Sequence, residues 1–116
     1  SQETGLEEDA GEVDVRALLV SAERLLDAGR FPHAELVYRR VLTREPRHTQ
    51  AARGLIDALE AQRPTDPEER MSSVLIAKLE RAYRGAWEME PEEDWARKLA
   101  GHLRIVKGDV RGAQLV

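Results

Sequence analysis

Residues 28–48, AGRFPHAELVYRRVLTREPRH, carry the pattern that decides the fold. One helix is predicted to close at Ala28 and Gly29, because glycine takes up the left-handed conformation that ends many helices. A second helix is predicted from Pro32, whose missing N–H would have no helical partner in a first turn. That helix stops before Pro46, since proline disfavours helical geometry in the residue before it. Apolar residues recur along it at spacings of three and four and form one stripe: Ala34, Val37, Tyr38, Val41 and Leu42.

The same spacing predicts helices on both sides of this stretch, and no segment alternates as a strand would. Asp66 is expected to cap the fourth helix, with Pro67 in its first turn and Glu69 as the capping-box partner. The sequence therefore predicts an all-α chain. The other helices are expected at about residues 13–28, 49–62, 67–89, 91–108 and 110–116.

A length of 116 residues limits the chain to one domain. It has no cysteine, which excludes disulfides and thiol catalysis. No apolar run is long enough for a transmembrane helix, and no signal peptide is visible, so we expect a cytoplasmic chain without membrane insertion. A leader that had already been removed would be equally invisible.

Charge is unevenly distributed along the chain. The net charge is −4, yet residues 1–14 alone carry −6 and no Lys or Arg. An acidic start without aromatic residues is typical of disorder, so residues 1–12 are predicted to be a disordered tail and 13–116 the helical domain. The tail is expected either to be a solvated linker or to fold back onto basic residues of the helical part.

The stretch resembles the tetratricopeptide repeat (TPR), a 34-residue helix–turn–helix. Counted from Val15, the family's preferred large, small, aromatic and proline positions fall on Leu18, Ala22, Leu25, Gly29, Ala34, Tyr38, Val41 and Pro46. Val41 departs from the pattern, because a small residue is usual there. The resemblance implies antiparallel helix pairs in a right-handed superhelical array, with repeats at about 15–48, 49–93 and 94–116, the last truncated. The alternative is an unrelated antiparallel helical bundle.

The second repeat is longer than the family pattern. Tyr83, Ala86 and Pro91 match its aromatic, small and proline positions, but 45 positions rather than 34 separate Pro46 from Pro91. The 11 extra residues amount to about three helical turns. We expect them between residues 63 and 77, mainly as an early start to the fourth helix.

In TPR proteins the first helix of each repeat lines a concave groove. Carried over to this sequence, the groove would be lined by Arg16, Leu19, Glu23, Leu26, Asp27, Gln50, Arg53, Asp57, Glu60, Ala61, Trp95, Lys98, His102, Ile105 and Val106. Such a mixed surface suits an amphipathic helix or an extended peptide. One TPR subclass clamps C-terminal carboxylates with Lys, Asn and Arg, but Leu19 and Glu23 occupy the first two of those positions and argue against this.

The departures from the repeat offer further candidate surfaces. Met71, Val74 and Leu75 would either pack against the end of the third helix or form an apolar ridge for a partner. Trp87 is expected in the core, whereas Trp95, beside charged residues, is expected to be an exposed anchor. The truncated third repeat leaves an apolar face for further chain or for a second copy.

Signals for chemistry are sparse, and neither a metal nor a cofactor is expected. His33, His48 and His102 have no second His at metal-binding spacing and no thiol to join them, and the sequence has no phosphate-binding glycine loop. A basic patch lies on and after the second helix (Arg39, Arg40, Arg44 and Arg47). The chain is acidic and the patch lacks stacking aromatics beyond Tyr38, so nucleic acid is not an expected partner. The sequence predicts a non-catalytic scaffold for a protein or peptide partner. The alternative is a structural unit that self-associates through its incomplete third repeat.

Overall fold

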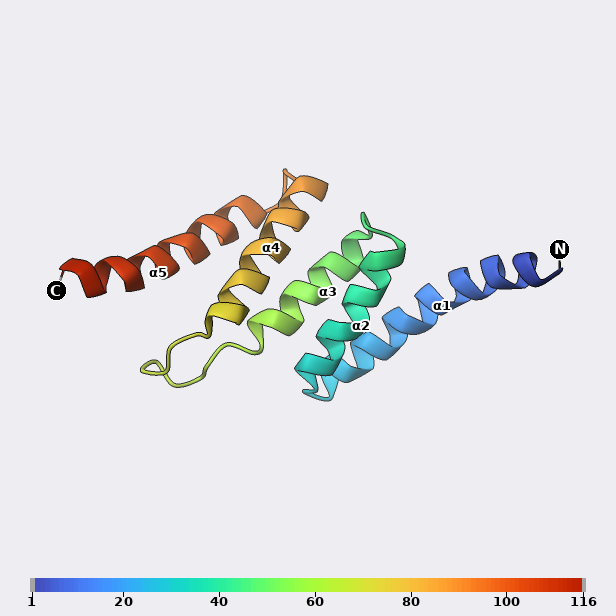
Figure 1. Ribbon diagram of the computed structural model, residues 1–116, viewed down its shortest axis with the longest axis horizontal. Coiled ribbons are helices and arrows are strands. Elements are labelled where there is room, and N and C mark those ends of the chain that lie inside the picture. The colour runs from blue at the N-terminus through green and yellow to red at the C-terminus, as the bar shows by residue number, and fades with distance from the viewer. Residues whose placement is uncertain (1, 116) are drawn as a thin grey trace.

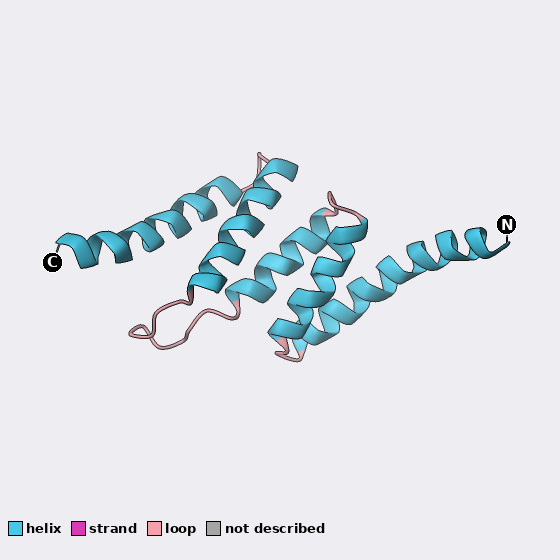
Figure 2. Ribbon diagram, in the orientation of Figure 1, coloured by secondary structure: helices cyan, strands magenta, loops and turns pink. Residues whose placement is uncertain are grey.

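The computed structural model describes the backbone of residues 2–115 and the side chains of residues 14–106. It contains five helices and, over residues 2–115, no strand (Figure 2). The all-α prediction is therefore confirmed. The helices are α1 (Gln2–Asp27), α2 (Phe31–Arg44), α3 (Thr49–Glu60), α4 (Ser73–Met89) and α5 (Trp95–Leu115).

The helices form an elongated array of 66 × 30 × 20 Å (Figure 1). Each helix packs against the next one along the chain in an antiparallel sense, and α1 also contacts α3. Within the described chain, α1 and α5 make no contact with each other and lie at opposite ends. This succession of neighbours gives each inner helix two packed sides.

The α1–α2 pair forms as the sequence predicts. Gly29 has a φ of 76°, and its N–H donates to the Leu26 carbonyl while the Arg30 N–H donates to that of Leu25. These two bonds satisfy carbonyls that the end of a helix would otherwise leave without donors. Ala22 and Ala34 are fully buried, because small side chains let the two helices approach closely.

The α2–α3 contact is built on a tyrosine and a glycine. A Cβ atom added at Gly54 would lie 2.2–2.7 Å from three ring atoms of Tyr38, which is itself buried. The chain enters α3 through His48, whose Nδ1 accepts a hydrogen bond of 3.2 Å from the Ala51 N–H. The ring of Tyr38 thus occupies the space that any larger residue at position 54 would need.

The early start predicted for the fourth helix is wrong. Helix α4 begins at Ser73, where the Ser72 hydroxyl accepts from the Leu75 N–H at 3.1 Å, and residues 61–72 form a loop. Asp66 accepts from the Glu68 N–H at 2.9 Å in a local turn and caps no helix. Residues 65–70 are almost entirely polar, so a helix there would have no apolar face to bury. The segment in which the 11 extra residues were expected is therefore mostly loop.

Both ends of the chain differ from their predicted boundaries. The backbone is helical from Gln2, within the segment predicted to be a disordered tail, and α5 continues past Gly108 instead of ending there. One glycine costs a helix only about 1 kcal/mol, which is too little to end it by itself. Side chains before Asp14 and after Val106 lie outside the described residues, so the boundary of the tail and its contact with basic residues stay predictions.

Candidate functional site

The residues expected to bind a partner divide into an exposed and a buried group. The exposed ones are Arg16, Glu23, Arg53, Asp57 and Lys98. Those that are partly or fully buried are Leu19, Met71, Leu75, Trp95 and His102. The first group is the more accessible to a partner, and its members lie on α1, α3 and α5.

Polar side chains on this face connect one helix to another. The Gln50 amide donates to the Glu23 carboxylate at 2.7 Å, which links α3 to α1. Arg53 forms ion pairs with Glu90 at 2.8 Å and Glu93 at 3.4 Å, which link α3 to the turn before α5. These contacts position neighbouring helices, and a ligand that used the same groups would have to displace them.

Asp57 lies in the same face, near other carboxylates. Burial and the charge of Glu60 raise the pKa of Asp57, while the charge of Lys98 opposes this rise. The Lys98 ammonium lies 4.0 Å from the Glu60 carboxylate. Among the side chains of residues 14–106, no three potential ligands gather closely enough to hold a metal ion.

The two tryptophans have exchanged their predicted roles. Trp95, expected to be an exposed anchor, is 8% exposed, with the Lys98 ammonium 4.9 Å from its ring centroid. It is the first residue of α5, and it packs into the core together with Leu99. Trp87, expected in the core, is 42% exposed, because Tyr83 and Ala86 already provide the buried face of α4.

His102 is buried in the core between α4 and α5. Its ring meets Tyr83 edge-on at a centroid distance of 5.5 Å, and its Nε2 lies 3.2 Å from the Ile76 carbonyl. Burial, with the charge of Arg63, lowers the pKa of His102, while the hydrogen bond to Ile76 and the charge of Glu80 oppose this. The placement of His102 on a partner-binding groove is therefore wrong.

The apolar ridge that was one of two alternatives near the insertion is not formed. Leu75 is 8% exposed and belongs to the core, and Met71 packs against that core from the loop. Val74 alone is well exposed, at 62%. Leu75 and Met71 thus follow the packing alternative considered for this segment.

A groove that the sequence did not reveal lies between α2 and α4, with α3 as its floor. We call it the α2–α4 groove, and it encloses about 390 Å³. It is lined by Arg39, Leu42, Thr43, Ala52, Leu55, Lys78, Arg81, Ala82, Gly85 and Met89. The floor, Ala52 and Leu55, is aliphatic, the walls mix aliphatic with polar side chains, and the charged lining residues are all cations.

A buried carboxylate holds this groove together. Glu35 is 4% exposed and forms ion pairs with Arg39 at 3.1 Å and Lys78 at 2.9 Å. The Gln62 amide also donates to it at 2.9 Å. Burial alone would raise the pKa of Glu35, but the hydrogen bonds from Gln62 and Lys78 and the two positive charges lower it on balance. Glu35 therefore stays ionised and ties α2 to α4.

Two signals in the sequence could have pointed to this arrangement. Lys78 is the one charge within the otherwise apolar stripe of α4. Glu35 and Arg39 have the i, i+4 spacing of a helical ion pair. Neither signal names a partner on another helix, because that pairing depends on how α2 and α4 pack.

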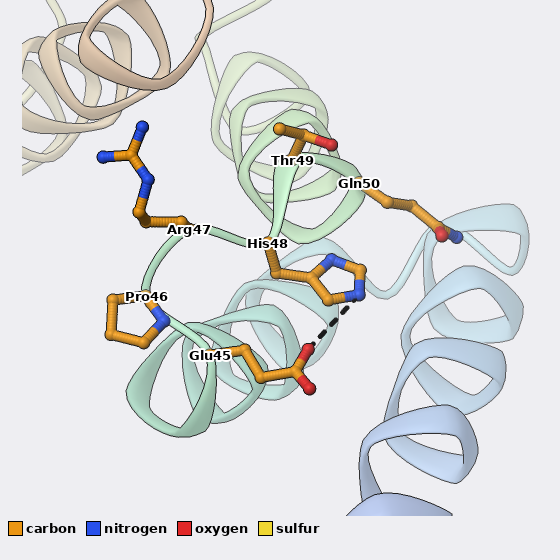
Figure 3. A pocket seen from close by; sticks show the side chains of 6 residues that line it. All are labelled: Glu45, Pro46, Arg47, His48, Thr49 and Gln50. Atoms are coloured by element: carbon orange, nitrogen blue, oxygen red, sulfur yellow. Dashed lines mark ion pairs between the residues drawn. The ribbon is translucent and has the colours of Figure 1, made fainter.

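A second hollow lies at the turn between α2 and α3, lined by residues 45–50 (Figure 3). Glu45 and His48 face each other across it, with the Glu45 carboxylate 3.7 Å from the His48 Nε2, while Arg47 points the other way. The opposite ring nitrogen of His48 caps α3. Because the polar groups of this hollow serve the turn itself, the α2–α4 groove is the stronger candidate site.

No helix in the described part of the chain has a stretch that is both long and apolar enough to cross a membrane. Comparison with known protein families, curated proteins and solved structures finds no match to this chain. The resemblance to TPR proteins therefore stays a prediction that rests on the residue pattern.

Proposed function

We propose that this chain is a non-catalytic protein–protein interaction module whose binding surface is the α2–α4 groove. The observation that carries the proposal is the combination of partly exposed aliphatic side chains, Leu42, Ala82 and Met89, with three cations in the walls of the groove. Apolar area supplies binding free energy, and the charges select the partner. A partner segment that is both apolar and acidic matches this surface.

The shape of the groove favours a helix as the bound element. Two helices that flank a third form a trough of the kind that receives the apolar face of an amphipathic helix. The volume of about 390 Å³ is within the range of pockets that bind specific ligands, about 300–1,000 Å³. The Glu35 ion pairs to Arg39 and Lys78 support the proposal further, because they fix the walls before a ligand arrives.

The adaptor role and the TPR-like architecture are part of the same proposal. Consecutive antiparallel pairs, α1–α2 and α3–α4, with buried Tyr38 and Tyr83 at matching repeat positions support it. The groove lies on the α2 and α4 side of the array, whereas the resemblance implies binding on the α1, α3 and α5 side. Links such as Gln50 to Glu23 occupy part of that second side.

The second candidate function is self-association through α5. A Cβ added at Gly101 would meet no atom within 4 Å, and Ile105 is 50% exposed. These residues leave one side of α5 available for a helix from a second copy.

Affinity capture with matched baits tests the proposal. Gly85 lines the groove, yet a Cβ there would meet no atom within 4 Å, so Gly85→Leu should fill the groove without disturbing the fold. Proteins that bind the wild type should be lost by Gly85→Leu and retained by Leu36→Glu, a change at an exposed position of α2 outside the groove. If Gly85→Leu captured the same proteins as the wild type, the proposal would be contradicted.

A further inference from the structure

We propose that the α2–α4 groove binds the N-terminal helical segment, residues 2–13, of a second copy of this chain. The inference rests on the proposed function and names the occupant of the same groove. The segment is acidic with aliphatic residues at helical spacing, and the groove is cationic with an aliphatic lining.

The segment has the composition that the groove requires. Leu6, Ala10 and Val13 recur at i, i+4 and i+7, which places them on one side of the helix that the backbone forms there. The charged residues of the segment are all acidic, Glu3, Glu7, Glu8, Asp9 and Glu12. The segment is therefore an acidic helix with a short aliphatic stripe.

The groove has the opposite charge and a matching floor. Its lining holds three cations, Arg39, Lys78 and Arg81, and no acidic residue. Arg39 and Lys78 share Glu35, whereas Arg81 forms no ion pair with any residue whose side chain is described. An acidic helix in this trough would pair with Arg81 and would cover the partly exposed Leu42, Ala82 and Met89 with its own aliphatic stripe.

The occupant has to come from another molecule. Asp14 forms an ion pair with Arg44 at the last turn of α2, and α1 runs on from there toward the N-terminus as one helix. In Figure 1 the N-terminal end of α1 points away from α4 and lies at the far side of α2. To reach its own groove, the segment would have to break α1 near Asp14. A second copy can present the segment with α1 intact.

Sedimentation velocity of the full chain over a concentration series tests the proposal. The wild type should associate, and Asp9→Lys or Arg81→Glu should each weaken the association by at least about tenfold, because each places like charges opposite each other. If the segment binds in the groove, the double variant Asp9→Lys/Arg81→Glu should recover most of the association that each single variant loses. Raising the salt from about 0.05 M to about 0.5 M should also weaken the wild-type association.

Matched controls separate the contact from the effect of net charge. Asp9 lies about 70° from the centre of the aliphatic stripe, whereas Glu8 lies on the opposite side of the helix. Glu8→Lys should therefore leave the association nearly unchanged. On α4, Arg84 is paired with Glu80 and does not line the groove, so Arg84→Glu is the control for Arg81→Glu. If circular dichroism shows that Arg81→Glu has unfolded, Gly85→Leu replaces it as the groove variant.

Several results would overturn the proposal. One is a chain that stays monomeric over the whole series. Another is association that tolerates both Arg81→Glu and Gly85→Leu but is lost in Ile105→Glu, which would assign the contact to α5. Equal effects of Asp9→Lys and Glu8→Lys would also contradict it. A monomeric chain whose captured proteins still depend on Gly85 would refute this inference and leave the proposed function standing.

Discussion

Lys78 of α4 pairs with the buried carboxylate of Glu35 on α2, with the Lys78 Nζ 2.9 Å from the Glu35 Oε2. Glu35 is the one buried carboxylate among the described side chains, and the pair joins two helices that are not neighbours along the chain. The pair bridges the two walls of the α2–α4 groove, so it connects the stability of the fold to the shape of the candidate site.

Replacing the carboxylate should weaken the fold. Glu35→Gln removes the charge that Arg39 and Lys78 share, and we expect a loss of about 1–3 kcal/mol in the free energy of unfolding. The loss should stay below the figure for a fully buried pair, because the side chains of Arg39 and Lys78 are 33% and 35% exposed. Urea denaturation measures it, with the exposed Glu88→Gln as the control. Equal stability of the two variants would refute the role of Glu35.

The stability of the chain should depend on pH through His102. Burial holds the pKa of His102 below its ordinary value of 6.5, so the unfolded chain binds a proton more readily than the folded one. Folding with a neutral His102 costs nothing extra above pH 6.5. As the pH falls through the lowered pKa, the folded state loses stability relative to the unfolded state, which takes up the proton first. The melting temperature should fall over this range in the wild type and in His33→Gln, and fall less in His102→Phe. Parallel curves for all three proteins would contradict the assignment.

A charge at the α1–α2 crossing should unfold the chain. Ala34 is fully buried, so Ala34→Glu would place an unpaired carboxylate between closely packed helices and should cost about 3 kcal/mol or more. Leu36→Glu makes a similar change at a position that is 61% exposed and should leave the melting curve nearly unchanged. A wild-type melting curve for Ala34→Glu would show that the helix register is wrong.

Two glycines should respond to alanine with opposite signs. At Gly54 the new methyl group would collide with the ring of Tyr38, so Gly54→Ala should destabilise the fold by about 1–3 kcal/mol. At Gly85 the space is open, so Gly85→Ala should stabilise α4 by about 1 kcal/mol through helix propensity. Chemical denaturation of both variants checks this, and stabilisation by Gly54→Ala would show that Tyr38 does not occupy that space.

Local patterns in the sequence were enough to predict the α1–α2 pair. Gly29, Pro32 and Pro46 mark the ends of helices through backbone geometry alone, and the stripe that contains Ala34 identifies the buried face. Such features need no knowledge of distant residues. The same reasoning failed at α4, because a capping pattern at Asp66 predicts a helix only where an apolar face follows it.

The candidate site could not be predicted in the same way, because it depends on contacts between helices. Trp95 has charged neighbours in the sequence, yet its position at the start of α5 directs it into the core. Trp87 continues an apolar stripe, but it lies at the edge of the buried face of α4. The pairing of Glu35 with Lys78 joins residues 43 positions apart, and no periodic pattern encodes that separation.

The most direct test of the account is the affinity of the groove for the acidic segment. Fluorescence anisotropy of a labelled peptide with the sequence of residues 1–14 would be followed as the wild-type chain or Gly85→Leu is added. We predict saturable binding by the wild type and binding that is weaker by at least about tenfold in Gly85→Leu, because the leucine side chain would occupy the α2–α4 groove. Equal binding by the two proteins would contradict the central claim that this groove receives the acidic segment.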